Sequence, residues 1–205
     1  MSPRRRQTSA RKAGSRGGSL SGAVGTLVLL AVVGGIAYRL GQQQALPTIP
    51  SAPTTLGAWT VRFSPQGGCT ELAVETINRA QRSIYVQAYS FTSAPIAKAL
   101  LAAKQRGVHV EAILDKSQRT EQYSEADFLA HAGVPVSIDA AHAIAHNKVM
   151  IIDDDTVITG SFNFTKAAEE HNAENLIVLH DRTLAAKYRA NWDAHRAHAA
   201  AYTPR

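Results

Sequence analysis

A chain of 205 residues has room for one ordinary domain with an appendage, and its 45% of hydrophobic residues is enough for a packed core. The 19% of charged residues excludes a disordered tail protein, and the single cysteine, Cys69, excludes a disulfide framework or a cysteine-rich metal site. The net charge of +6 says little about nucleic acid. Seven of the 22 basic residues lie within residues 1–41, which hold no Asp or Glu, so the rest of the chain carries 15 basic against 16 acidic residues and is nearly neutral.

The N-terminal part divides into three segments. Residues 1–18 are basic, and residues 19–40 contain an uncharged run that as a helix would cover ~28 Å, close to the ~30 Å thickness of bilayer hydrocarbon. This pattern predicts a transmembrane signal-anchor with the following domain outside the cytoplasm, or alternatively a signal peptide that is removed on export. Residues 41–58, rich in Pro, Gln and Thr, predict a linker to a domain at 59–205.

Strand-like and helix-like patterns alternate from residue 59 onward. Strands are predicted at 59–63, 83–90, 108–115, 134–138, 146–152, 156–160 and 174–180. Helices are predicted at 70–81, 94–106, 121–132 and 182–198. The alternation predicts an α/β three-layer sandwich, in which helices flank a central mixed β-sheet, with a candidate site in the loops at 139–146 and 161–173.

The segment 145–179 holds the residues with the clearest chemistry. His146 and Lys148 are two apart on a predicted strand, so both side chains project from one face. An acidic turn at 153–155 ends this strand, and the next strand returns antiparallel and ends in Gly160 and Ser161. The predicted hairpin therefore gathers an imidazole, an ammonium group, a hydroxyl and, from Asn163, a carboxamide.

This set of side chains suits a phosphodiester substrate. Lys148 and Asn163 can hold non-bridging oxygens, and Ser161 can add a donor. His146 is then free to attack phosphorus as a nitrogen nucleophile. Paired with His142, four residues earlier, it could also imitate a helical metal-binding pair, but the β-branched run that follows and the lack of a third nearby ligand argue against this.

An attacking histidine needs an acceptor that fixes its far nitrogen. Glu174, which begins a predicted strand, is the candidate for this role. Asp153 is an alternative, but its odd separation from His146 turns it to the other face of a regular strand. We therefore assign Asp153 to the turn and to fold stabilisation.

The pattern H-x-K-x4-D, filled by His146, Lys148 and Asp153 and followed by GSFN at 160–163, resembles the signature of the phospholipase D superfamily. Upstream segments at 63–71, 83–100 and 106–115 are similar to its small bacterial endonuclease branch. The resemblance implies a phospholipase D-like fold and a mechanism without metal or cofactor. In that family one histidine forms a phosphohistidine while a second protonates the leaving group.

Carried over by position, the pocket residues are His146, Lys148, Ser161, Asn163 and Glu174. The small nucleases carry one motif per chain and pair two chains, which implies a symmetric homodimer here. The expected activity is that of a metal-independent, non-specific endonuclease on DNA or RNA. The alternatives are a phospholipase D acting on phospholipid headgroups and a membrane-anchored, non-catalytic nucleic-acid-binding protein. The resemblance to anchored or exported bacterial relatives places the chain in the inner membrane with its catalytic domain in the periplasm, or exported after signal cleavage.

Overall fold

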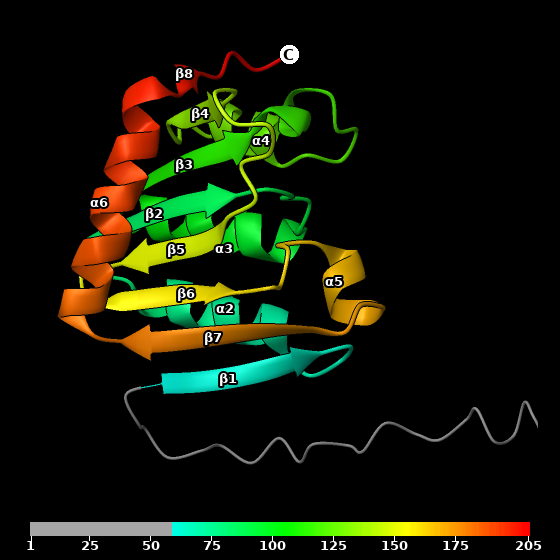
Figure 1. Ribbon diagram of the computed structural model, residues 1–205, viewed down its shortest axis with the longest axis vertical. Helices are drawn as coiled ribbons and strands as arrows, with labels where there is room; N and C mark the ends of the chain where they lie inside the picture. The colour runs from blue at the N-terminus through cyan, green and yellow to red at the C-terminus, as the bar shows by residue number, and fades with distance from the viewer. Residues whose placement is uncertain (1–58) are drawn as a thin grey trace, which may run out of the picture. The chain divides into compact units, whose positions relative to one another are not determined.

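The computed structural model describes residues 59–205, so the predicted basic segment, anchor or signal peptide, and linker lie outside the described residues. An eight-stranded mixed sheet runs through this part of the chain in the order β1-β7-β6-β5-β2-β3-β4-β8 (Figure 1). The strands are β1 (Trp59–Ser64), β2 (Ser83–Ala88), β3 (His109–Asp115), β4 (Val136–Asp139), β5 (Lys148–Ile152), β6 (Thr156–Gly160), β7 (Glu174–His180) and β8 (Ala200–Ala201).

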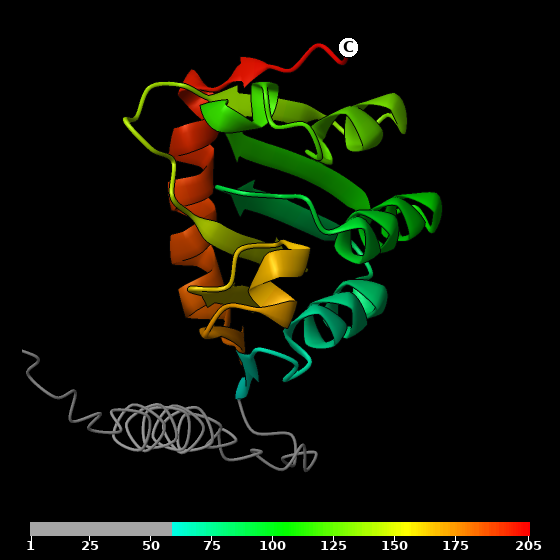
Figure 2. The same cartoon turned by 90° about the vertical axis from the view of Figure 1, so that its right-hand side faces the viewer.

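Helices cover both faces of this sheet, which confirms the predicted arrangement (Figure 2). On one face lie α2 (Cys69–Arg79), α3 (Ala94–Gln105) and α4 (Ala126–His131), and on the other lies α6 (Arg182–His198). Successive side chains of β2 point to opposite faces of the sheet. Ile84 and Val86 join the larger hydrophobic core on one face, while Tyr85 packs toward Trp192 of α6 on the other.

The long helix α6 covers its face alone and begins and ends where the sequence predicts. The Asp181 side chain caps its first turn by accepting a hydrogen bond from the Leu184 backbone N–H at 2.9 Å. In its fourth turn the buried Trp192 donates from Nε1 to the Val86 carbonyl at 2.9 Å. These bonds fix the helix along the middle of the sheet.

Several predicted boundaries differ from the structure, among them these three. The helix expected at 121–132 covers only Ala126–His131, because the Glu125 backbone N–H donates to the Phe91 carbonyl and holds the preceding segment in turns. The strand expected from residue 146 begins at Lys148. The loop expected at 161–173 contains a short helix, α5 (Lys166–Glu170), capped by the Thr165 hydroxyl.

No helix within residues 59–205 has the length and apolar character needed to span a bilayer.

Candidate active site

Strand register brings the H-x-K segment and the GSFN segment together at one end of the neighbouring strands β5 and β6. Lys148, the first residue of β5, pairs with Ala88, the last residue of β2. The antiparallel register of β5 with β6 then places Gly160 opposite Lys148, and β7 begins at this same edge with Glu174. The predicted hairpin is thus confirmed, and it brings together segments up to 86 residues apart in the chain.

His146 lies in the loop just before β5 and is exposed to solvent. Its imidazole packs against the ring of Tyr89, with 4.7 Å between ring centroids. Lys148 Nζ lies 5.1 Å from the centroid of the same ring and donates to the carbonyl of His146 at 2.8 Å. Tyr89, which has no place in the motif, therefore contacts both the imidazole and the ammonium group.

The environment of Lys148 lowers the pKa of its ammonium group. Burial lowers it, because charge is costly away from water, and the negative charge of Glu174 partly opposes this effect by raising it. Glu174 Oε1 accepts a hydrogen bond from Asn172 Nδ2 at 3.1 Å, and within the described residues no hydrogen bond joins it to His146. Its proposed role in orienting the imidazole stays a prediction.

Gly160 must be glycine on two grounds. Its φ of +141° lies where L side chains are rarely found, and a Cβ there would lie 2.2 Å from the carbonyl oxygen of Asn175. The close approach lets the Asn175 backbone N–H donate to Ser161 Oγ at 3.1 Å. Because the Ser161 oxygen is the acceptor there, its own hydrogen stays available to a substrate oxygen.

The rest of the GSFN segment alternates between core and surface. Phe162 and Phe164 are fully buried in the larger core and hold the segment down, while the half-buried Asn163 lies between them. In the described part of the chain, Asn163 Oδ1 is buried without a hydrogen-bond partner. A buried amide with unused capacity is suited to a ligand-binding position.

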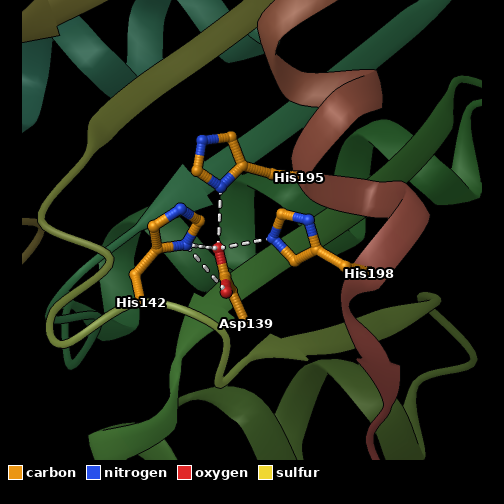
Figure 3. Close-up of side chains that lie close together, drawn as sticks. All are labelled: Asp139, His142, His195 and His198. Atoms are coloured by element: carbon orange, nitrogen blue, oxygen red, sulfur yellow. Dashed lines mark hydrogen bonds and ion pairs between the residues drawn. The ribbon is translucent and has the colours of Figure 1, made fainter.

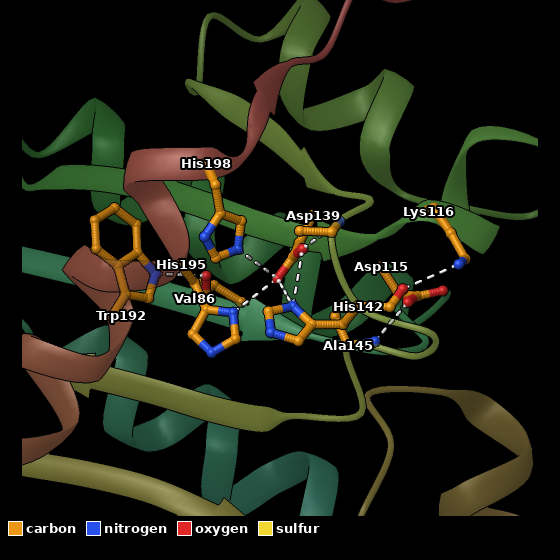
Figure 4. A network of polar contacts seen from close by, with 10 residues as sticks. Val86, Asp115, Lys116, Asp139, His142, Ala145, Trp192, His195 and His198 are labelled. Carbon is orange, nitrogen blue, oxygen red and sulfur yellow. Dashed lines mark hydrogen bonds and ion pairs between the residues drawn. The ribbon is translucent and has the colours of Figure 1, made fainter.

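The loop at 140–147, which carries His146, is held at several points. The carboxylate of Asp115 accepts from the Ala145 backbone N–H at 2.7 Å and from that of Ser117 at 2.9 Å (Figure 4). Burial raises the pKa of Asp115, but these hydrogen bonds outweigh it and the net pKa lies below the ordinary value. Lys116 Nζ donates to the carbonyl of His142 at 3.0 Å.

Asp153 lies at the far end of β5, away from the other motif residues. Its carboxylate accepts hydrogen bonds from the backbone N–H groups of Gln81, Arg82 and Ser83. A surface hollow near that end is lined by Asp153, Arg79, His180 and other residues, none of which is a predicted pocket residue. At the other end of β5, His146 and Ser161 are exposed, whereas Lys148 is buried.

A second group of titratable side chains gathers where the C-terminal end of β4 meets the end of α6 (Figure 3). Asp139, His142, His195 and His198, referred to below as the histidine cluster, offer ligand atoms that all lie within 4.8 Å of one another. Sequence reasoning missed this cluster because it paired His142 only with its neighbour in the chain. The available signal was the repeated spacing D-x2-H at 139–142 and H-x2-H at 195–198.

This fold, with its motif residues gathered at one sheet edge, defines the class of protein. Residues 73–196 match the family described as "Cardiolipin synthase, PLD-like domain". The chain therefore belongs to the phospholipase D superfamily, and the resemblance seen in the sequence is confirmed.

Among similar proteins, "Phospholipase D" of Rickettsia felis is 49% identical over 130 residues, which are 63% of this chain and 65% of that protein. "Mitochondrial cardiolipin hydrolase" of Xenopus tropicalis is 33% identical over 56% of this chain and 55% of that protein. Among solved structures, Nuc, a phospholipase D family member from Salmonella typhimurium, has a TM-score of 0.68 and 41% identity, covering 70% of this chain and 97% of that one. NucT from Helicobacter pylori has a TM-score of 0.64 and 25% identity, covering 70% of this chain and 99% of that one. The matched region thus spans less than two thirds of the length of the two sequence relatives but nearly all of the two solved chains.

Proposed function

We propose that the chain is a metal-independent phosphodiesterase that cleaves DNA or RNA without sequence preference through a phosphohistidine intermediate. The observation that carries the proposal is the intact motif: His146, Lys148 and the GSFN segment meet at one edge of the sheet although they come from different strands and loops. A site centred on phosphate contacts reads the nucleic-acid backbone and not the base sequence.

The proposed reaction has two displacement steps. A ring nitrogen of His146 attacks phosphorus and forms a P–N bond while the P–O bond to the leaving group breaks, and a second imidazole protonates the departing oxygen. That second imidazole then takes a proton from water, whose oxygen bonds to phosphorus as the P–N bond breaks. Lys148, Ser161 and Asn163 hold the non-bridging oxygens, whose charge grows in each transition state.

The second imidazole is proposed to be His146 of the partner subunit in a symmetric homodimer. Two observations support this: the chain has one H-x-K pair, and His146 and Ser161 are exposed to solvent. In such a dimer Ile144, which is 57% exposed and two residues before the nucleophile, is proposed to lie in the interface.

Nuclease activity is favoured over lipid hydrolysis by the extent of the matches. The similarity to Nuc runs over 97% of that chain, whereas the similarity to the rickettsial phospholipase D covers 65% of that protein. Phospholipid hydrolysis stays the second candidate, because relatives named phospholipase D and mitochondrial cardiolipin hydrolase share this domain and residues 19–40 predict a membrane anchor. A non-catalytic role is disfavoured, since gripping phosphate needs no oriented nucleophile.

One assay separates these candidates. The full-length chain is incubated with plasmid DNA, RNA, or vesicles of phosphatidylcholine and cardiolipin in the presence of EDTA. We expect cleavage of nucleic acid, and a covalent, acid-labile protein–oligonucleotide adduct when the reaction is quenched by denaturation at alkaline pH. His146→Ala should abolish both without changing Tm, while His131→Ala, which removes an exposed histidine of α4, should change neither.

Three outcomes would count against the proposal. Cleavage of lipid alone would replace the nuclease by the phospholipase. Loss of all turnover in EDTA while the domain stays folded would overturn metal independence. Turnover without any trapped adduct would point to direct attack by water.

A further inference from the structure

The histidine cluster lies apart from the proposed nucleophile and is not used by the proposed reaction. Asp139 ends β4, His142 belongs to the loop that follows, and His195 and His198 occupy the last turn of α6 (Figure 3). Two segments distant in sequence, 139–142 and 195–198, therefore converge on one carboxylate. Its side chain is fully buried, whereas the side chains of His142 and His198 are 46% and 37% exposed.

The three imidazoles all direct a nitrogen at the same carboxylate oxygen. Asp139 Oδ2 lies 3.0 Å from His142 Nδ1, 2.7 Å from His195 Nδ1 and 3.3 Å from His198 Nε2. Its other oxygen, Oδ1, is held by the backbone N–H of Ala141 at 3.0 Å, which fixes the orientation of the carboxylate. The donor set is thus three imidazole nitrogens and one oriented carboxylate oxygen.

These distances are close to those of a tetrahedral zinc site. With Zn–N and Zn–O bonds of ~2.0–2.1 Å, neighbouring ligand atoms of a tetrahedron lie ~3.3 Å apart. The three separations from Asp139 Oδ2 are 2.7–3.3 Å, and the imidazole nitrogens, within 4.8 Å of one another, would have to converge by up to ~1.5 Å to bind one ion. The exposed side chains of His142 and His198 can make that adjustment without disturbing the core.

The ligand types also suit a divalent cation. The three rings lie with centroids 4.8–5.4 Å apart, so three imidazoles face one small volume beside the carboxylate. Imidazole nitrogen and carboxylate oxygen are ligands that Zn²⁺ takes readily.

We propose that Asp139, His142, His195 and His198 form a Zn²⁺ site of the structural type, closed by four protein ligands, that ties the end of α6 to the loop carrying His146. The helix side of this link is anchored by Trp192, whose indole bonds to β2 one turn before His195 (Figure 4). The loop side continues from His142, whose carbonyl Lys116 also holds, to Ala145 and then His146. The ion therefore restrains the loop without entering the reaction.

Metal content and thermal stability test the site independently of catalysis. Untagged full-length chain is stripped with EDTA, dialysed against ZnCl₂ and analysed for bound zinc, and its Tm is compared with and without the ion. We expect one zinc per chain and a rise in Tm of about 5–10 °C at saturation. Co²⁺ in place of zinc should give the intense visible absorption of tetrahedral coordination.

Single substitutions at the two exposed ligands should remove these properties without unfolding the protein. In His142→Ala and His198→Ala we expect zinc affinity to fall at least tenfold and most of the Tm rise to disappear, while His131→Ala keeps both. His146→Ala, which lacks the proposed nucleophile, should still bind one zinc, so failure of the phosphodiesterase proposal and failure of this one are distinguishable.

The proposal is overturned if the stripped chain takes up no zinc, or if the double variant His142→Ala/His198→Ala binds as much as the wild type. Zinc that is lost in His146→Ala but retained in His198→Ala would place the ion at the motif and equally overturn it. Uptake of Cu²⁺ or Ni²⁺ without Zn²⁺ would contradict the assignment of the metal.

Discussion

The carboxylate of Asp153 stabilises the fold at the end of β5 opposite the proposed active site, and a single substitution can separate this role from catalysis. Its Oδ2 accepts from the backbone N–H of Gln81 at 2.8 Å, and its Oδ1 accepts from those of Arg82 and Ser83 at 2.7 and 3.0 Å. From Lys148 to Asp153 the chain advances five residues along a strand, or ~17 Å. The carboxylate is thus too far from His146 and Lys148 to touch a reacting phosphorus.

Asp153→Asn keeps the shape of the side chain and tolerates the residue's left-handed φ of 54°. The amide oxygen can keep the place of Oδ1, but the NH₂ group then faces the Gln81 N–H, so one hydrogen bond is lost and the other two lose their charge. Hydrogen bonds to charged groups contribute ~1.5–3 kcal/mol and neutral ones ~1 kcal/mol. Because the Gln81 and Arg82 bonds are exposed, we expect a net loss of about 2 kcal/mol, or a fall in Tm of about 4–8 °C.

The assay is thermal unfolding together with kcat/KM at 25 °C. Asp154→Asn is the matched control, because Asp154 is the next residue, is exposed and shares a left-handed φ of 61°. The control should leave Tm unchanged, and both variants should retain kcat/KM. An Asp153→Asn variant with unaltered Tm but strongly reduced kcat would refute the reasoning and place this carboxylate in the chemistry.

The pH dependence of this effect has a definite sign. Burial raises the pKa of Asp153. The backbone hydrogen bonds from Ser83, Gln81 and Arg82 lower it by more than burial raises it, so the net pKa lies below the ordinary value. A depressed folded-state pKa contributes stability above the unfolded-state pKa of ~3.9, and this contribution is lost as pH falls through the folded-state pKa. The difference in Tm between wild type and Asp153→Asn should therefore stay constant from neutral pH down to about 5 and shrink below about 4.

Three further predictions concern the motif edge. Since burial lowers the pKa of Lys148 and Glu174 raises it, the alkaline limb of the pH profile of kcat/KM should lie below the usual lysine range and move to still lower pH in Glu174→Gln; an unmoved limb would disconnect the two residues. Gly160→Ala should cost about 3 kcal/mol in the free energy of unfolding, measured by urea denaturation, because its Cβ would lie 2.2 Å from the Asn175 carbonyl oxygen; a neutral effect would contradict the tight turn. Ile144→Asp should turn a dimer into a monomer in light scattering and abolish turnover; a fully active monomer would defeat the composite site.

Most of the fold follows from local patterns in the sequence. The alternation of strand-like and helix-like patterns predicts α6 at its observed bounds and the order of strands β1 to β7. The elements that were missed depend on contacts distant in the chain. The five-residue helix α5 is too short to show periodicity, and it is fixed where Glu169 accepts hydrogen bonds from the backbone of Gly68 and Thr70 at the start of α2.

The candidate site divides in the same way. The H-x-K and GSFN segments are recognisable because their residues lie close in sequence and join through one hairpin. Tyr89 reaches the site only through the pairing of β2 with β5, and the histidine cluster forms only because β4 and the end of α6 lie side by side. Neither contact can be deduced from residues that are near one another in the sequence, because each depends on how the elements are arranged across the sheet.

Strand β5 gives a physical reason for the spacing of the motif. Lys148 is its first residue and Ile152 its last, so the four positions between Lys148 and Asp153 are the body of a buried strand. Lys148 lies at the end of β5 where phosphate is proposed to bind. Asp153, at the other end, hydrogen-bonds to the start of β2. Removing one residue from this strand would turn every side chain on one side of the deletion to the opposite face of the sheet. The interval between the lysine and the aspartate is therefore fixed by the length of β5 and not by direct contact between the two residues.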